Sequence, residues 1–187
     1  MHTELHLVVC KHDFMITLFV ENCNDISQNF YDSVVNNLQL HRLSCSCGHS
    51  SCLSIHGYYY RTAKLPAGDI RLKICRVKCS ECGKTHALLL SSMVPYSQIR
   101  LIDQQRICAG YEAGSRSSDI CDDNLSIDEN NIKSVIRNYR QCWKEKLISL
   151  KISLSPLGEL VRSCFLLYSA QFMQIHRGTN KLFPCTT

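Results

Sequence analysis

The sequence predicts an α+β protein in which a small β-hairpin module, bracketed by paired cysteines, precedes a helical module. Two observations support this prediction. Between residues 41 and 99, two short cysteine pairs flank a stretch with β-strand character. Residues 100–150 instead show the three- and four-residue apolar spacing of amphipathic helices. A chain of 187 residues is long enough for one domain or two small ones.

Four segments follow one another along the chain. Residues 1–40 contain short apolar runs and an Asn/Asp-rich stretch but no motif, so their role is left unassigned. Residues 41–99 form the cysteine-rich module, and residues 100–150 form the helical module. Residues 151–187 contain one amphipathic helix, which follows Ser155-Pro156, and a short tail.

The hairpin is predicted from two strands around a turn. Residues 53–61 are rich in Ile and Tyr, and the turn Pro66-Ala67-Gly68-Asp69 follows them. Residues 70–78 then alternate, so that the apolar side chains lie on one face and Arg71 and Lys73 lie on the other. The alternation breaks near Cys75, where we expect a β-bulge.

Thirteen cysteines, an odd number, favour a reducing compartment and a metal site over a disulfide framework. The pairs Cys45-Ser46-Cys47-Gly48 and Cys79-Ser80-Glu81-Cys82-Gly83 bracket the predicted hairpin. Tetrahedral Zn²⁺ takes four such ligands from two short turns, so the sequence predicts a zinc ribbon. Cys52, His49 and Cys75 are possible substitutes in this pattern, and Cys52 is the main alternative to Cys45. Buried free thiols, or a redox-active C-x-x-C, are the alternatives to a metal site.

Positive charge is concentrated around the same cysteines. Residues 41–100 hold nine basic and two acidic residues, a local net charge of +7 in a chain of net charge +5. Such a field favours a polyanion, most simply duplex DNA. We expect Arg61, Arg71 and Lys73 to contact its phosphates.

The helical module is predicted as three helices, over residues 102–113, over residues 117–121, and from a capping box at Ser126 and Glu129 onward. The third has an apolar stripe that runs from Ile132 to Leu147. This order is typical of a helix-turn-helix, whose last helix enters the major groove. The residues expected to face DNA are Asn130, Lys133, Arg137 and Arg140. The alternative is an ordinary solvated helix face, since residues 101–150 carry a net charge of −1.

Other function classes have little support in the sequence. The motifs of P-loop, serine-hydrolase, zincin and dinucleotide-binding enzymes are absent from it, and a closed four-cysteine site leaves no open coordination position. We therefore expect no enzymatic activity. No apolar run approaches the roughly 20 residues of a membrane-spanning helix, and no signal peptide is apparent, so a cytoplasmic location is expected.

Four stretches carry a resemblance to a known family. They are residues 43–49 (LSCSCGH), 56–61 (HGYYYR), 74–86 (ICRVKCSECGKTH) and 87–98 (ALLLSSMVPYSQ). Over about residues 43–99 the chain resembles the zinc-ribbon N-terminal region of insertion-sequence transposases. It is more closely similar to small stand-alone bacterial proteins of unknown function that keep such a ribbon. Residues 101–150 resemble, less specifically, the helix-turn-helix that follows it.

This resemblance implies zinc at Cys45, Cys47, Cys79 and Cys82, and DNA binding by the ribbon together with the helices. Those transposases continue into an RNase-H-like catalytic domain, whereas about 37 residues follow residue 150 here. Transposase chemistry is therefore not expected. The sequence predicts a zinc-stabilised DNA-binding protein without a catalytic domain. A protein-interaction adaptor with a structural zinc ribbon is the first alternative, and a redox-active thiol protein is the second.

Overall fold

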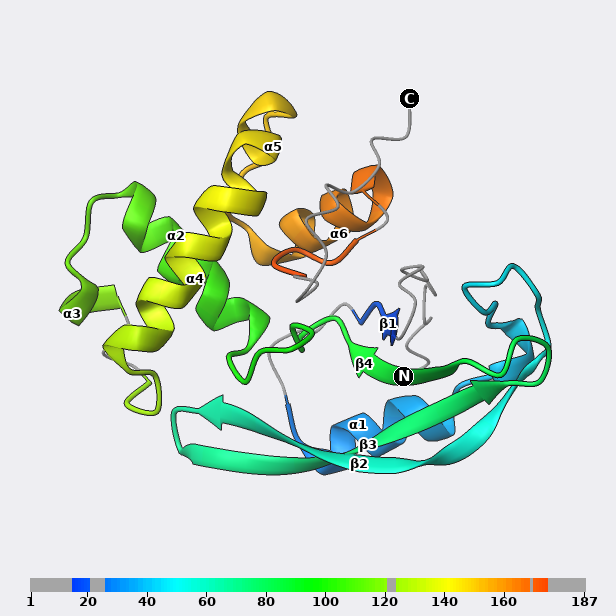
Figure 1. Cartoon of the computed structure of the whole chain (residues 1–187). Coiled ribbons are helices and arrows are strands. Elements are labelled where there is room, and N and C mark those ends of the chain that lie inside the picture. The colour runs from blue at the N-terminus through cyan, green and yellow to red at the C-terminus, as the bar shows by residue number, and fades with distance from the viewer. Residues whose placement is uncertain (1–14, 21–25, 121–123, 169, 175–187) are drawn as a thin grey trace.

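The computed structural model describes residues 15–20, 26–120, 124–168 and 170–174 of the chain. Its described part is mixed α+β, which confirms the predicted class. A four-stranded sheet has the order β1-β4-β3-β2, and most of the helices gather beyond one side of it (Figure 1). Within the described residues, every helix is too short or too polar to span a bilayer.

The hairpin is present and is longer than predicted. Strand β2 (Leu53–Leu65) pairs antiparallel with β3 (Gly68–Cys79), and the two are joined at Pro66-Ala67. The prediction of a bulge at Cys75 of β3 is wrong in position. The register instead shifts in β2, between Ile55 and Gly57. The alternation of β3 breaks at Cys75 for another reason. Cys75 lies on the Arg71 face, but here this face is covered by helix α1 (Gln28–Asn36).

The N-terminal segment, which carries no motif, completes the sheet. Strand β1 (Met15–Leu18) pairs in parallel with β4 (Thr85–Leu90), about 70 residues further along the chain. Tyr31 of α1 lies where β4 diverges from β3. Its hydroxyl donates to the Leu88 carbonyl at 3.0 Å and accepts from the Cys75 amide at 2.8 Å. The described parts of residues 1–40 are therefore structural, while 1–14 and 21–25 lie outside the described residues.

The helices form a second apolar cluster beside the one that covers the sheet. Their bounds are α2 Leu101–Glu112, α3 Ser117–Ile120, α4 Glu129–Cys142, α5 Lys144–Ser149 and α6 Leu157–Tyr168, with a 3₁₀ turn at Leu40–Arg42. The apolar stripe expected from Ile132 to Leu147 is buried, with Val135, Tyr139 and Trp143 between its ends.

Three details of the predicted helical module are wrong. Ser126 does not cap α4; Asp128 does, in a capping box with Asn131, because the Ser126 hydroxyl donates instead to the Leu65 carbonyl at 3.2 Å. The third helix is not continuous, since it is interrupted at Trp143. Residues 121–123 lie outside the described residues, and residues 124–128 before α4 already form a longer link than the three- to four-residue turn of a helix-turn-helix.

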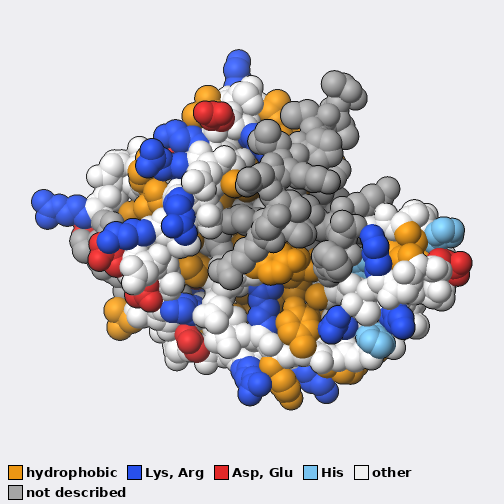
Figure 2. All heavy atoms as spheres, in the orientation of Figure 1, with side chains coloured by type: hydrophobic (Ala, Val, Ile, Leu, Met, Phe, Trp, Pro, Cys, Tyr) orange, Lys and Arg blue, Asp and Glu red, His pale blue; other side chains and the backbone are white. Residues whose placement is uncertain are grey.

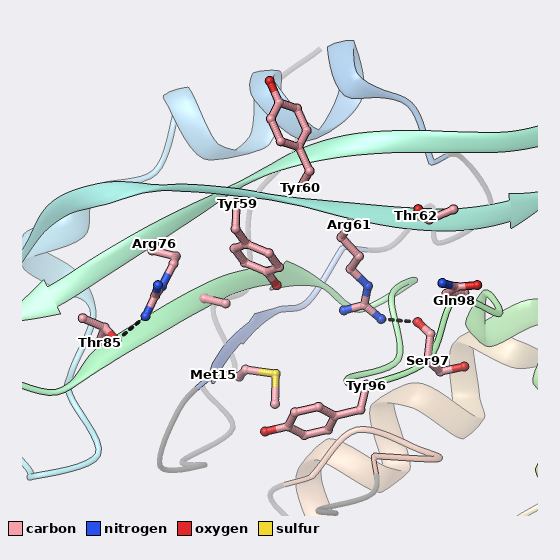
Figure 3. Close-up of a pocket in the computed structure, with 11 residues that line it drawn as sticks. Met15, Tyr59, Tyr60, Arg61, Thr62, Arg76, Thr85, Tyr96, Ser97 and Gln98 are labelled. Atoms are coloured by element: carbon pink, nitrogen blue, oxygen red, sulfur yellow. Dashed lines mark hydrogen bonds between the residues drawn. The ribbon is translucent and has the colours of Figure 1, made fainter.

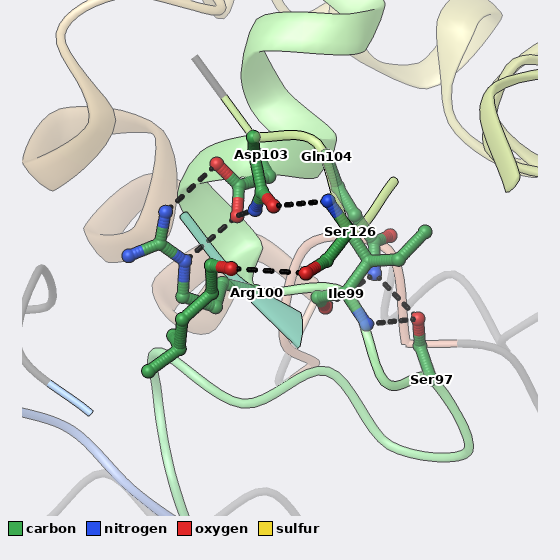
Figure 4. Close-up of polar contacts among 8 residues, drawn as sticks. Ser97, Ile99, Arg100, Asp103, Gln104 and Ser126 are labelled. Carbon is green, nitrogen blue, oxygen red and sulfur yellow. Dashed lines mark hydrogen bonds and ion pairs between the residues drawn. The ribbon is translucent and has the colours of Figure 1, made fainter. Parts of the chain in front are cut away.

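A buried polar cluster joins the sheet to the helices (Figure 4). Arg100, which precedes α2, donates to Asp103 through Nε at 2.7 Å and Nη2 at 3.0 Å. Asn124 donates to the same carboxylate at 3.3 Å, and Gln104 donates to the Ile99 carbonyl at 3.0 Å. The start of α2 is therefore held against both the loop before it and the chain that leads into α4.

Candidate metal centre and basic surfaces

Two tight turns carry the four cysteines. In the first, the Gly48 amide donates to the Cys45 carbonyl at 2.9 Å; in the second, the Gly83 amide donates to the Cys79 carbonyl at 3.1 Å. Both glycines have positive φ, +93° and +71°, a region that side chains with a Cβ rarely adopt. Each glycine thus lets the backbone reverse directly after a cysteine, so both thiols of a pair turn to the same side.

The four sulfur atoms form a compact group. The Sγ atoms of Cys45, Cys47, Cys79 and Cys82 all lie within 4.8 Å of one another. Two of the separations are 3.5 Å, from Cys45 to Cys82, and 3.8 Å, from Cys47 to Cys79. A tetrahedral site with metal–sulfur bonds of about 2.3 Å has sulfur–sulfur edges of about 3.8 Å. The spacing and the donor atoms both fit, so these four cysteines could hold a metal ion.

The thiols of the group differ in their surroundings. Burial raises the pKa of Cys45 to about 12. A hydrogen bond from the His49 backbone lowers the pKa of Cys47 to about 6, with a further contribution from the His49 ring, whose Nδ1 lies 3.4 Å from Cys47 Sγ. The Cys82 backbone likewise lowers the pKa of Cys79. The backbone donors thus favour the thiolate forms of Cys47 and Cys79, whereas burial disfavours the thiolate of Cys45 unless a cation lies beside it.

Cys52, the alternative to Cys45, lies outside the four-sulfur group. Its thiol donates to the His49 carbonyl at 3.2 Å, and burial raises its pKa, which favours the protonated thiol. Cys52 also contributes to the lowered pKa of Cys79. The structure therefore places Cys52 behind a member of the group, as a supporting thiol.

His86 is a site residue that sequence patterns did not identify. It is fully buried on β4, and its Nε2 lies 3.2 Å from Cys45 Sγ. A ring nitrogen at this distance can donate to a thiolate and so orient it. The only sequence signal was its place shortly after the second cysteine pair, which by itself does not distinguish a supporting histidine from a surface one.

The two faces of the hairpin carry different basic residues. Arg71 and Lys73 lie on one face, which we call the outer face, above the exposed rings of Tyr60 and Tyr58, at 4.3 Å and 4.4 Å from the ring centroids. Arg61 lies on the opposite face, where it donates to the Val94 and Ser97 carbonyls. Arg61 is therefore not part of the exposed surface with which it was grouped, and its contacts are structural.

The predicted residues of α4 are all exposed: Asn130, Lys133, Arg137 and Arg140. Lys133 is paired with Glu129 at 2.9 Å, one turn earlier. Figure 2 shows Lys and Arg side chains gathered over α4 and α5, and a second group along the edge formed by β2 and β3, with acidic side chains between them. In this view the two groups of basic side chains do not form one continuous surface.

Comparison with known proteins identifies one similar family. The sequence model of a family described as "Domain of unknown function (DUF6431)" matches residues 44–130. The matched region runs from the first cysteine turn through the hairpin, α2 and α3, and ends at the start of α4. Neither the curated proteins nor the solved structures gave a match.

Proposed function

We propose that this protein is a zinc-stabilised, non-enzymatic DNA-binding protein. The observation that carries the proposal is a four-sulfur group at the base of a hairpin whose outer face presents Arg71 and Lys73. Four cysteine donors in tetrahedral spacing favour zinc over the harder cations, which prefer oxygen ligands. A site closed by four protein ligands supplies folding energy and has no position left for a substrate.

The outer face suits phosphate contacts. Arg71 and Lys73 have no carboxylate partner among the described residues, so their charge is available to a polyanion. The rings beneath them hold the two cations on one side of a rigid strand. Contacts of this kind are independent of base sequence and position a protein on a duplex.

A second contact would come from α4, where Asn130 and Arg137 are exposed. Arg pairs with guanine and Asn with adenine, so these are the residues best suited to read bases in the major groove. The long link between α3 and α4 departs from the helix-turn-helix pattern. Support for base contacts therefore comes from the exposed side chains of α4 and not from a helix-turn-helix motif.

The test is the salt dependence of duplex binding, measured by a mobility shift with the zinc-loaded protein. Each neutralised phosphate contributes about 0.9 to the slope of log K against log salt. The variant Arg71→Gln/Lys73→Gln should therefore lower the slope by about 2. A matched control, Arg116→Gln/Arg162→Gln, removes the same charge elsewhere and should leave the slope nearly unchanged. An unchanged slope in the first variant would exclude the outer face as a DNA contact.

A protein-interaction adaptor is the alternative, and one observation favours it. Ile148 of α5 and Leu166 of α6 are exposed by 64% and 69%, and exposed apolar side chains of this size can contact a partner protein. Failure of the zinc-loaded protein to bind any duplex at low salt would favour the adaptor, because phosphate contacts are strongest under that condition.

A further inference from the structure

A cavity of about 690 Å³ lies between the inner face of the hairpin and the loop that contains Tyr96, Ser97 and Gln98 (Figure 3). We call it the arginine–tyrosine cavity. Its volume is in the range of small-molecule sites. It lies on the opposite side of the hairpin from Arg71 and Lys73, so the proposed duplex contact does not use it.

The cavity is positively charged. Arg61 and Arg76 line it, and among the described residues no Asp or Glu lines it. Arg61 is held by the carbonyls of Val94 and Ser97, and Arg76 donates to the Thr85 hydroxyl at 2.7 Å. Among the described residues, neither guanidinium forms an ion pair. Burial lowers the pKa of Arg61, and a hydrogen bond with the Tyr59 side chain opposes this shift.

Aromatic rings accompany the two arginines. Tyr59 of β2 pairs with Ile74 of β3, and Arg61 pairs with Leu72. Arg76 comes two residues after Ile74 on β3, so its side chain is on the same face. Tyr59 therefore lies between the two arginines on this face. Figure 3 shows the Tyr59 ring directed into the cavity, with Tyr96 on the facing loop. Tyr96 has a φ of +60°, an unfavourable conformation for a bulky residue and one that a surrounding structure must maintain.

We propose that the arginine–tyrosine cavity binds a nucleoside phosphate. The exposed guanidinium of Arg76 would bind the phosphate oxygens, since a fork of N–H donors matches them, and Arg61 adds positive charge to the cavity. The base would stack on Tyr59, because every base offers a flat face to an aromatic ring. A free nucleotide and an unpaired nucleotide of a DNA strand share this chemistry. The inference goes beyond the proposed duplex binding and uses different residues.

Titration calorimetry on the full chain tests the inference with four probes: deoxyadenosine monophosphate, deoxyadenosine, inorganic phosphate and a short single-stranded oligonucleotide. We expect the monophosphate to bind at least about tenfold more tightly than the nucleoside or phosphate alone, because only it engages both Arg76 and the Tyr59 ring. Tighter binding of the oligonucleotide would assign the site to an unpaired strand. Tighter binding of the monophosphate would assign it to a free nucleotide.

Matched variants separate this site from the outer face. Arg76→Gln should weaken monophosphate binding by about tenfold or more, whereas Arg71→Gln, on the same strand but the opposite face, should not. Tyr59→Leu and Tyr58→Leu form a second such pair on β2. Arg76 is exposed, so its replacement should leave the fold intact, and amide spectra would verify this. No heat of binding with the monophosphate at millimolar concentration, or equal affinity in Arg76→Gln and the parent, would overturn the inference. If Arg71→Gln weakens duplex binding and Arg76→Gln does not, the proposed DNA-binding function is supported whatever the result with the monophosphate.

Discussion

Lys64 Nζ, near the end of β2, lies 2.9 Å from Asn131 Oδ1 in the first turn of α4. The same ammonium donates to the Ser126 carbonyl at 2.7 Å. Asn131 also closes the capping box of α4, since its backbone amide donates to Asp128 Oδ1 at 2.8 Å. The tip of the hairpin is thus hydrogen-bonded to the start of α4, which sets the orientation of the two proposed DNA-contacting elements.

Replacing Lys64 with Met should loosen this connection. The change keeps most of the aliphatic chain and removes two charge-assisted hydrogen bonds, so we expect a loss of about 1–3 kcal/mol in the free energy of unfolding. Hydrogen exchange should also accelerate in the first turn of α4. The control is Lys133→Met, which removes only the exposed pair with Glu129 and should change stability by at most about 0.5 kcal/mol. Equal effects of the two variants would contradict this role of Lys64.

The metal prediction is tested by removing the second cysteine pair. Cys79→Ser/Cys82→Ser should release the metal and unfold the hairpin module, because the binding energy of a structural zinc site is largely folding energy. Metal content by mass spectrometry and amide exchange over residues 43–90 would measure both effects. One zinc per chain in the double variant would contradict the assignment.

Single variants distinguish the fourth ligand from its neighbour. Cys45→Ser should lose the metal more readily than Cys52→Ser, because Cys45 Sγ belongs to the four-sulfur group and the Cys52 thiol only supports it. The measurement is the chelator concentration that removes half of the metal. If a lower chelator concentration removes the metal from Cys52→Ser than from Cys45→Ser, Cys52 is the ligand and Cys45 is the supporting thiol.

Asp103 should contribute strongly to stability. It is buried, and Arg100 and Asn124 both donate to it. Asp103→Ala leaves the guanidinium of Arg100, which is largely buried, without its partner, and such changes cost about 3–5 kcal/mol. Urea unfolding would measure the loss. The exposed Asp128→Ala removes an N-cap, and its smaller expected loss of about 1 kcal/mol provides the scale.

Arg137 and Trp143 should separate recognition from stability. Arg137→Ala should weaken binding to a preferred duplex by about 1–3 kcal/mol and change binding to random DNA little. Trp143→Ala should instead lower stability by about 3–5 kcal/mol, because its ring is buried against Tyr168 and Phe172. If Arg137→Ala binds both duplexes like the parent, α4 presents only a solvated face, and the adaptor alternative gains support.

Several features of this protein follow from local sequence alone. The two cysteine turns, the hairpin around Pro66-Ala67 and the buried stripe from Ile132 to Tyr139 were all predicted, because spacing and periodicity over a few residues encode them. The same local patterns predicted the wrong N-cap for α4, Ser126 in place of Asp128. Ser126 and Asp128 are both good caps, and only a partner on the hairpin, the Leu65 carbonyl, decides between them.

Other features depend on contacts between distant segments. The parallel pairing of β1 with β4 leaves no local signal, because each strand is only a short apolar run until the other lies beside it. Arg61 and Arg71 look alike in sequence, yet the pairing of β2 with β3 places them on opposite faces, and a shift of one residue in that pairing would place them on the same face. His86 and Asp103 are likewise buried beside partners from other segments, Cys45 and Asn124. The sequence by itself determined which residues could form the metal site and the helices, whereas tertiary packing decided which polar side chains became buried, since burial depends on neighbours that spacing along the chain does not specify.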